Sequence, residues 1–110
     1  MNNDLLIHVG GRKSVAVNSI LMLKANINYT LIFLDDGSQI LSSTTIGILE
    51  KRLKDYQFFR PNRSTIINLE FMADFEKKSQ VGSYSRIVLK NNEEVLISRR
   101  RTMKFLRVMQ

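Results

Sequence analysis

The side chains of this sequence that are best suited to chemistry lie in three short polar segments: Asn26–Tyr29, Phe59–Ser64 and Ser98–Arg101. An Asn amide offers both a donor and an acceptor to a base edge, and an Arg can bond guanine twice or clamp a phosphate. Both residue types also have structural uses, because Asn favours turns and Arg can pair with a carboxylate inside a fold. The segments are therefore candidate nucleic-acid contacts, with the structural uses left open.

Groups for catalysis are scarce. The sequence has one His and no Cys, which excludes thiolate chemistry, disulfides and Cys-ligated zinc. His8 lies in an apolar run, so we expect a packed or edge-strand histidine rather than a metal ligand. The Asp35-Asp36 pair precedes Gly37 and is explained by turn chemistry, and no glycine-rich phosphate loop or nucleophile motif is present. We expect a binding module that is not an enzyme and needs no cofactor or metal.

Positive charge is concentrated in the second half of the chain. The 110 residues carry a formal net charge of +7. Residues 1–56 hold 6 basic and 5 acidic side chains, a net +1, whereas residues 57–110 hold 11 and 5, a net +6. Beyond Glu94 no acidic residue follows. Such an excess attracts polyanions, of which nucleic acid is the commonest, although a basic surface can also simply keep a small domain soluble.

Length and hydropathy favour one compact domain over residues 1–110, because a chain of this size buries one core but not two. The longest apolar runs, Ile20–Leu23 and Leu31–Leu34, have four residues each. That is far below the ~20 needed to cross a bilayer. The N-terminus lacks the pattern of a secretion signal. Together with the absence of Cys, this suits a cytoplasmic protein.

Most of the chain has the period of β-strands. Leu5–Val9 and Ser14–Val17 are predicted to pair around a Gly10-Gly11 turn, and residues 25–28 are predicted to separate Ile20–Lys24 from Tyr29–Leu34. Further predicted elements are a turn at Asp35–Gly37, the strand Ser38–Leu41, a turn at Pro61, the strand Ser64–Ile67, a strand from near Leu69 toward Lys77, a turn at Ser79–Ser83, and a last hairpin of Tyr84–Lys90 and Glu94–Ser98 around Asn91-Asn92.

Two segments have the period of helices. Between Thr44 and Tyr56 the apolar residues recur at i, i+3, i+7 and i+10, which predicts an amphipathic helix that needs a sheet to pack on. Between Arg101 and Met109 one side is apolar and the other basic. Many short strands with one or two short helices, and no strand-helix-strand alternation, predict a mainly β, antiparallel domain.

The segment Phe58–Leu69 resembles the signature of the LytTR DNA-binding domain, found in transcriptional response regulators: an aromatic, an Arg, a variable residue, commonly His, then Arg-Ser, apolar residues and Asn. Two further blocks, Leu23–Thr30 and Ile97–Arg100, fall in the family's order. The resemblance spans roughly Asp4 to Val108. It implies a β-rich domain that binds DNA without a recognition helix and sends loops into successive major grooves.

The resemblance also assigns residues. Contacts to bases are expected at Asn28 or Tyr29, at Arg63 and at Arg100. Arg60 is expected on phosphate, and the other phosphate or supporting contacts are Asn62, Ser64, Ser98, Arg99, Arg101 and Lys104. Two residues depart from the family pattern: Asn62 stands where His is common, which could change the base read nearby, and Lys24 stands where an acidic residue is frequent.

The leading interpretation is a sequence-specific regulator that binds double-stranded DNA, with paired direct repeats as targets, a homodimer on DNA and a separate regulatory partner as further expectations. The chain leaves no room for a receiver domain, so it is read as a freestanding regulator or an excised domain. One alternative is a small β-barrel-like module for single-stranded nucleic acid. Another is a basic module for protein or anionic-membrane interaction, which would use the terminal helix.

Overall fold

The computed structural model describes residues 5–77 and 85–109. Within these ranges the chain forms short strands, two α-helices and two single-turn 3-10 helices. In chain order the elements are β1 (Leu6–His8), β2 (Ser14–Ala16), η1 (Val17–Ser19), β3 (Ile20–Asn26), β4 (Tyr29–Leu34), β5 (Gln39–Ser42), α1 (Ile46–Arg52), β6 (Phe58–Asn62), β7 (Thr65–Asn68), η2 (Leu69–Phe71), β8 (Met72–Glu76), β9 (Ser85–Leu89), β10 (Glu94–Ile97) and α2 (Arg99–Val108).

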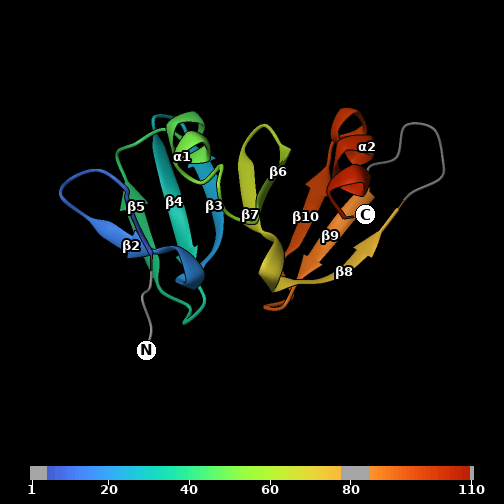
Figure 1. Ribbon diagram of the computed structural model, residues 1–110, viewed down its shortest axis with the longest axis horizontal. Coiled ribbons are helices and arrows are strands. Elements are labelled where there is room, and N and C mark those ends of the chain that lie inside the picture. The colour runs from blue at the N-terminus through green and yellow to red at the C-terminus, as the bar shows by residue number, and fades with distance from the viewer. Residues whose placement is uncertain (1–4, 78–84, 110) are drawn as a thin grey trace.

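The strands form three antiparallel sheets, which confirms the predicted mainly β, antiparallel class (Figure 1). The five-stranded sheet has the order β5-β4-β3-β7-β6, the three-stranded sheet has the order β10-β9-β8, and β1 pairs with β2. Figure 1 shows α1 on the five-stranded sheet and α2 beside the three-stranded sheet. Strand β6 is thus the edge of the larger sheet that faces the smaller one.

The expectation of a single core is wrong: two hydrophobic cores lie on the two faces of the five-stranded sheet. The first contains Ile7, Val9, Val15, Val17, Ile20, Leu23, Ile32, Ile46, Leu49, Leu53 and Ile66. The second contains Leu21, Met22, Phe59, Ile67, Ile87, Leu89, Val95, Ile97 and Phe105. Strands β3 and β7 supply both cores, and a strand buried on both faces reads as a continuous apolar run. This burial explains the unbroken apolar stretch Ile20–Leu23.

Helix α1 covers the first core but is shorter than predicted. It ends at Arg52, because the backbone leaves helical geometry at Leu53 (φ −99°, ψ 2°) and continues in turns to Tyr56. The predicted stripe nevertheless packs as expected, since Leu49 and Leu53 are buried and Tyr56 is partly buried against the same core.

Helix α2 packs on the second core and begins two residues earlier than predicted, at Arg99. The carbonyl of Ser98 accepts hydrogen bonds from the Arg101 and Thr102 amides and from the Thr102 hydroxyl, which fixes the first turn. Thr102 and Phe105 are buried as expected, whereas Met109 is 44% exposed at the end of the helix.

Two predicted turns are shifted in the structure. The first hairpin turns at Gly11-Arg12, not at Gly10-Gly11, because both Gly11 and Arg12 have positive φ and Lys13 donates to the Gly10 carbonyl. The predicted turn at Pro61 is wrong: Pro61 is a residue of β6 and the chain reverses after it, at Arg63-Ser64. Proline is tolerated there because β6 is an edge strand whose pairing is irregular between Phe59 and Asn62.

Two other turn predictions are confirmed, and the turn of the last hairpin is shifted by one residue. The loop between β3 and β4 narrows to Ile27-Asn28, since β3 continues to Asn26. At Asp35–Gly37 the Asp36 carboxylate accepts from the Ser38 hydroxyl and amide, and these bonds lower the pKa of Asp36. The last hairpin is present, but it turns at Lys90-Asn91, one residue before the predicted Asn91-Asn92, because the Asn92 amide donates to the Leu89 carbonyl. The turn predicted at Ser79–Ser83 lies outside the described residues.

Candidate nucleic-acid interface

Strand β6 contacts both hydrophobic cores through a pair of adjacent aromatic residues, Phe58 and Phe59. Side chains alternate between the faces of a strand, so neighbours point to opposite sides. Phe58 packs against the first core, whereas Phe59 is buried in the second and meets Phe105 edge to face at 5.3 Å between ring centroids. The two aromatics of the Phe58–Leu69 segment therefore anchor β6 in both cores at once.

Hydrogen bonds also tie β6 to the start of α2. The Ser98 amide donates to the Pro61 carbonyl at 3.1 Å, and the Asn62 side-chain amide donates to the Leu96 carbonyl at 2.7 Å. The Arg101 guanidinium donates to the Arg60 carbonyl at 3.0 Å. These three bonds, which we call the β6 junction, hold the turn after β6 beside the first turn of α2.

The turn between β3 and β4 lies at the same end of the five-stranded sheet. Lys24 pairs with Thr65 across β3 and β7, and the Ala25 amide donates to the Ser64 carbonyl at 2.8 Å. The β3–β4 turn therefore lies next to the β6–β7 turn at this end of the sheet. We call the resulting surface, made of Ile27–Tyr29, Arg63-Ser64 and Ser98–Lys104, the basic edge.

The structure brings the residues predicted for DNA contact together on the basic edge, except Arg60 and Asn62, which lie in the β6 strand beneath it. The four expected base contacts, Asn28, Tyr29, Arg63 and Arg100, are exposed, and so are Ser64, Arg99 and Lys104. Arg60, Asn62, Ser98 and Arg101 are partly buried. Tyr29 is half-exposed and lines a shallow pocket with Gly10, Lys13 and Leu41, so its ring lies toward the first hairpin.

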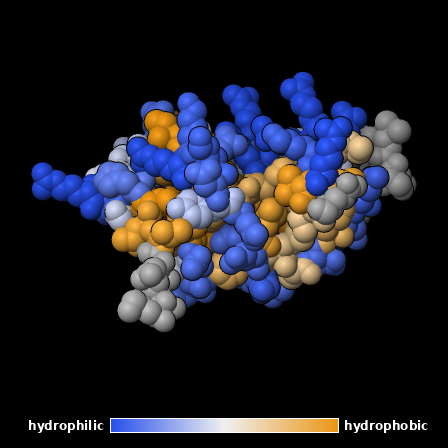
Figure 2. Space-filling model, in the orientation of Figure 1, coloured by the Kyte–Doolittle hydropathy of each residue, from blue (hydrophilic) through white to orange (hydrophobic). Residues whose placement is uncertain are grey.

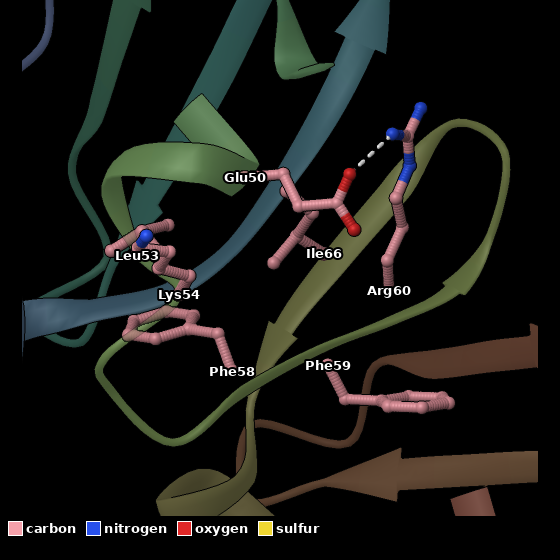
Figure 3. A pocket seen from close by; sticks show the side chains of 7 residues that line it. All are labelled: Glu50, Leu53, Lys54, Phe58, Phe59, Arg60 and Ile66. Carbon is pink, nitrogen blue, oxygen red and sulfur yellow. Dashed lines mark hydrogen bonds and ion pairs between the residues drawn. The ribbon is translucent and has the colours of Figure 1, made fainter. Parts of the chain in front are cut away.

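Arg60 is bound by other residues of the protein, and Figure 3 shows its guanidinium directed toward Glu50. Its guanidinium forms an ion pair with Glu50 of α1 at 2.8 Å and donates to the Arg63 carbonyl at 2.6 Å. The Arg60 side chain is only 18% exposed. Arg60 therefore connects helix α1 to the backbone of the Arg63-Ser64 turn. The sequence left open that an Arg pairs with a carboxylate, but it gave no signal that Glu50 is that partner.

Asn62 has a structural use that involves both ends of its amide. Its Oδ1 atom accepts from the Ser64 amide at 3.0 Å and from the Ser64 hydroxyl at 3.1 Å, while its Nδ2 atom makes the bond to Leu96. An Asn that bonds the backbone two residues on is a common turn device. Asn62 thus shapes the Arg63-Ser64 turn and docks it on β10, which is a supporting role.

Charges separate along the strand direction. The basic edge contains Arg63, Arg99, Arg100, Arg101 and Lys104 and no acidic residue. Asp35 and Asp36 of the β4–β5 turn and Glu70 of η2, which follows β7, lie at the opposite ends of the strands. Glu50 lies near the basic edge, where its carboxylate is paired with Arg60. Figure 2 shows long hydrophilic side chains projecting along the upper edge of the molecule, where Figure 1 places the β6–β7 turn and the start of α2. The basic edge therefore suits an extended anionic partner.

The β6 junction predicts unequal effects of two similar asparagines. The Asn91 side chain accepts from the amide two residues on, Glu93, at 3.0 Å, as Asn62 does from Ser64. Among the described residues Asn91 shows no side-chain bond to a second sheet, whereas Asn62 bonds Leu96. We expect Asn62→Ala to lower the free energy of unfolding by about 1–3 kcal/mol and Asn91→Ala by less than about 1 kcal/mol, measured by urea denaturation. Equal losses would show that the bond to Leu96 does not stabilise the junction.

Comparison with known proteins shows the family and the fold of this chain. The LytTr DNA-binding domain family matches residues 10–110. A similar solved structure is the LytTr DNA-binding domain of a response regulator from Bacillus cereus, which is 18% identical, has a TM-score of 0.74 and aligns over 99% of this chain and 98% of that one. That likeness concerns the fold, and a search of curated proteins finds no match. Because the family match covers nearly the whole sequence, this chain belongs to the LytTr DNA-binding domain family.

Proposed function

We propose that this chain is a sequence-specific transcription regulator, or the DNA-binding part of one, which reads successive major grooves of double-stranded DNA with the turns of its basic edge. The observation that carries the proposal is the position of two exposed turns and the start of α2 side by side, with Asn28, Arg63 and Arg100 exposed. Asn and Arg are the side chains that pair most specifically with adenine and guanine edges in the major groove.

The proposed roles combine exposure with the family resemblance. Asn28 or Tyr29, Arg63 and Arg100 read bases, as the resemblance implies, and they are exposed on two turns and at the start of α2, where they can enter a groove. Ser64, Arg99 and Lys104, which are also exposed, bind phosphates and set the register. The partly buried residues Asn62, Ser98 and Arg101 support the edge from below. Arg60 was expected on phosphate, but its bonds to Glu50 and to the Arg63 carbonyl favour a supporting role.

The alternatives fit the structure less well. A binder of single strands needs exposed aromatic rings for base stacking. Among the described residues, Tyr29 alone of the aromatic side chains is exposed, and Phe33, Phe71 and Phe75 pack against the second core. A membrane-surface helix needs a continuous free apolar face, whereas in α2 Phe105 is buried and Leu106 is partly buried, which leaves Met103 and Val108 as its exposed apolar side chains. No helix in the described part of the chain is long and apolar enough to span a bilayer.

The proposal extends to partners. Each copy presents one short edge, so two copies on paired direct repeats would double the sequence that is read and would form a dimer on DNA. A separate protein would supply the regulatory input. Binding to a bacterial chromosome would place this work in the cytoplasm.

The class of ligand is tested by titration at two salt concentrations against duplex DNA, single-stranded DNA and anionic vesicles. Each phosphate neutralised on a duplex contributes about −0.9 to the slope of log K against log salt. Arg99 and Lys104 are the exposed cations of the basic edge that are assigned to phosphates. We expect preference for duplex DNA with a slope of about −2. Tighter binding to single strands or vesicles, or a slope near zero, would refute duplex binding.

Base reading is tested by substituting the exposed cations one at a time. We expect Arg63→Ala and Arg100→Ala each to lower the ratio of specific to random duplex affinity about tenfold or more, because a bidentate Arg contact to guanine discriminates by about 1–3 kcal/mol. Lys104→Ala serves as the matched control and should lower both affinities together, as expected for a phosphate contact. An unchanged ratio for both Arg variants would mean that these arginines do not read bases.

A further inference from the structure

Ile27 is the most exposed of the large apolar side chains in the described part of the chain, at 91%. It also has a positive φ of 56°, in the left-handed region that β-branched residues avoid because their branched Cβ is crowded there. Gly and Asn adopt this conformation at lower cost. Neither burial nor backbone preference therefore explains an isoleucine at this turn, and both would favour its replacement.

The position of Ile27 is set firmly by its surroundings. Asn26 pairs with Tyr29, so Ile27 and Asn28 form the entire two-residue connection between β3 and β4. The Ala25 amide bonds the Ser64 carbonyl, which holds this hairpin beside the Arg63-Ser64 turn. Ile27 is thus an exposed apolar side chain at a tip of the basic edge, between two asparagines. The other exposed large apolar side chains of that edge are Tyr29 in the same hairpin and Met103 in α2.

We propose that Ile27 is a specificity-determining residue that reads thymine, by packing against the thymine C5 methyl group in the major groove; this inference rests on the proposed function. In the major groove the thymine methyl is the apolar group of the base edges, so an apolar side chain there distinguishes thymine from the other bases. The residues on either side of Ile27 are Asn26 and Asn28, whose side chains carry amides. Arg63 lies on the neighbouring β6–β7 turn. Single apolar side chains, separated by Asn and Arg residues on a basic surface, suit a groove lined by phosphates better than a protein interface, whose centre is a wider apolar patch.

Deoxyuridine provides a direct test, because it lacks only the methyl group. Each thymine of a duplex selected by the wild-type protein is replaced in turn by deoxyuridine, and binding is measured for the wild type and for Ile27→Asn. We expect one position, or two adjacent ones, at which deoxyuridine lowers wild-type affinity roughly three- to tenfold, the order expected for loss of one buried methyl contact. At that position Ile27→Asn should show no loss, and its affinity for the unmodified duplex should already be lower by a similar factor.

Two controls separate contact from folding. Leu6→Asn changes another exposed apolar residue, in β1, and should retain the wild-type response to deoxyuridine. The melting temperature of Ile27→Asn should be equal to that of the wild type or higher, because Asn tolerates positive φ. A lower melting temperature would overturn the claim that isoleucine is not there for stability.

The possible failures are distinguishable. If the wild type binds selected and scrambled duplexes equally, the proposed function fails and this inference fails with it. If binding is selective but no thymine shows a loss that Ile27→Asn removes, only the reading of thymine is overturned. If Ile27→Asn weakens binding to paired sites but not to a single site, Ile27 contacts a second copy of the chain, and the thymine contact is again refuted.

Discussion

The hydrogen bonds that β6 makes on its outer side are the interaction on which the arrangement of this molecule depends. An edge strand normally leaves one row of polar groups to solvent. Here the carbonyls of Arg60 and Pro61 accept from Arg101 and Ser98, and the Asn62 amide reaches Leu96. The strand is therefore bonded on both sides, although it pairs with a strand only at β7. These bonds fix the start of α2 against the Arg63-Ser64 turn.

This junction separates the residues that hold the basic edge from those that can reach a ligand. Arg60 and Asn62 direct their donors and acceptors to protein partners, whereas Arg63 and Arg100 direct exposed side chains outward from the same short segments. Neighbouring residues of the Phe58–Leu69 segment thus differ in role: Arg60 and Asn62 bond other parts of the protein, whereas Arg63 is exposed. Specific recognition benefits when polar side chains are held in place before binding, because less conformational entropy is lost on contact.

The periodicity of the sequence predicted most strands and both helices, whereas it could not predict contacts between segments that are distant in the sequence. The strand Tyr29–Leu34, the last hairpin and both amphipathic helices follow from local pattern, and the buried faces of α1 and α2 were largely as predicted. The Pro61 turn was wrong because local propensity does not report that β6 is an edge strand with irregular pairing, where proline is accepted. The Glu50–Arg60 ion pair joins residues that only the fold brings together. The exposed turns were found in the sequence through the motif, but their alignment on one edge required the sheet register.

Amide chemical-shift mapping by NMR during titration with a selected duplex shows whether DNA binds at the basic edge. If it does, the perturbed amides will cluster at residues 27–29, 62–64 and 98–104. The amides at the opposite ends of the strands, at 35–38, 69–71 and 91–93, should keep their chemical shifts. Perturbations centred on those residues, or on the β1–β2 hairpin, would show that DNA binds elsewhere.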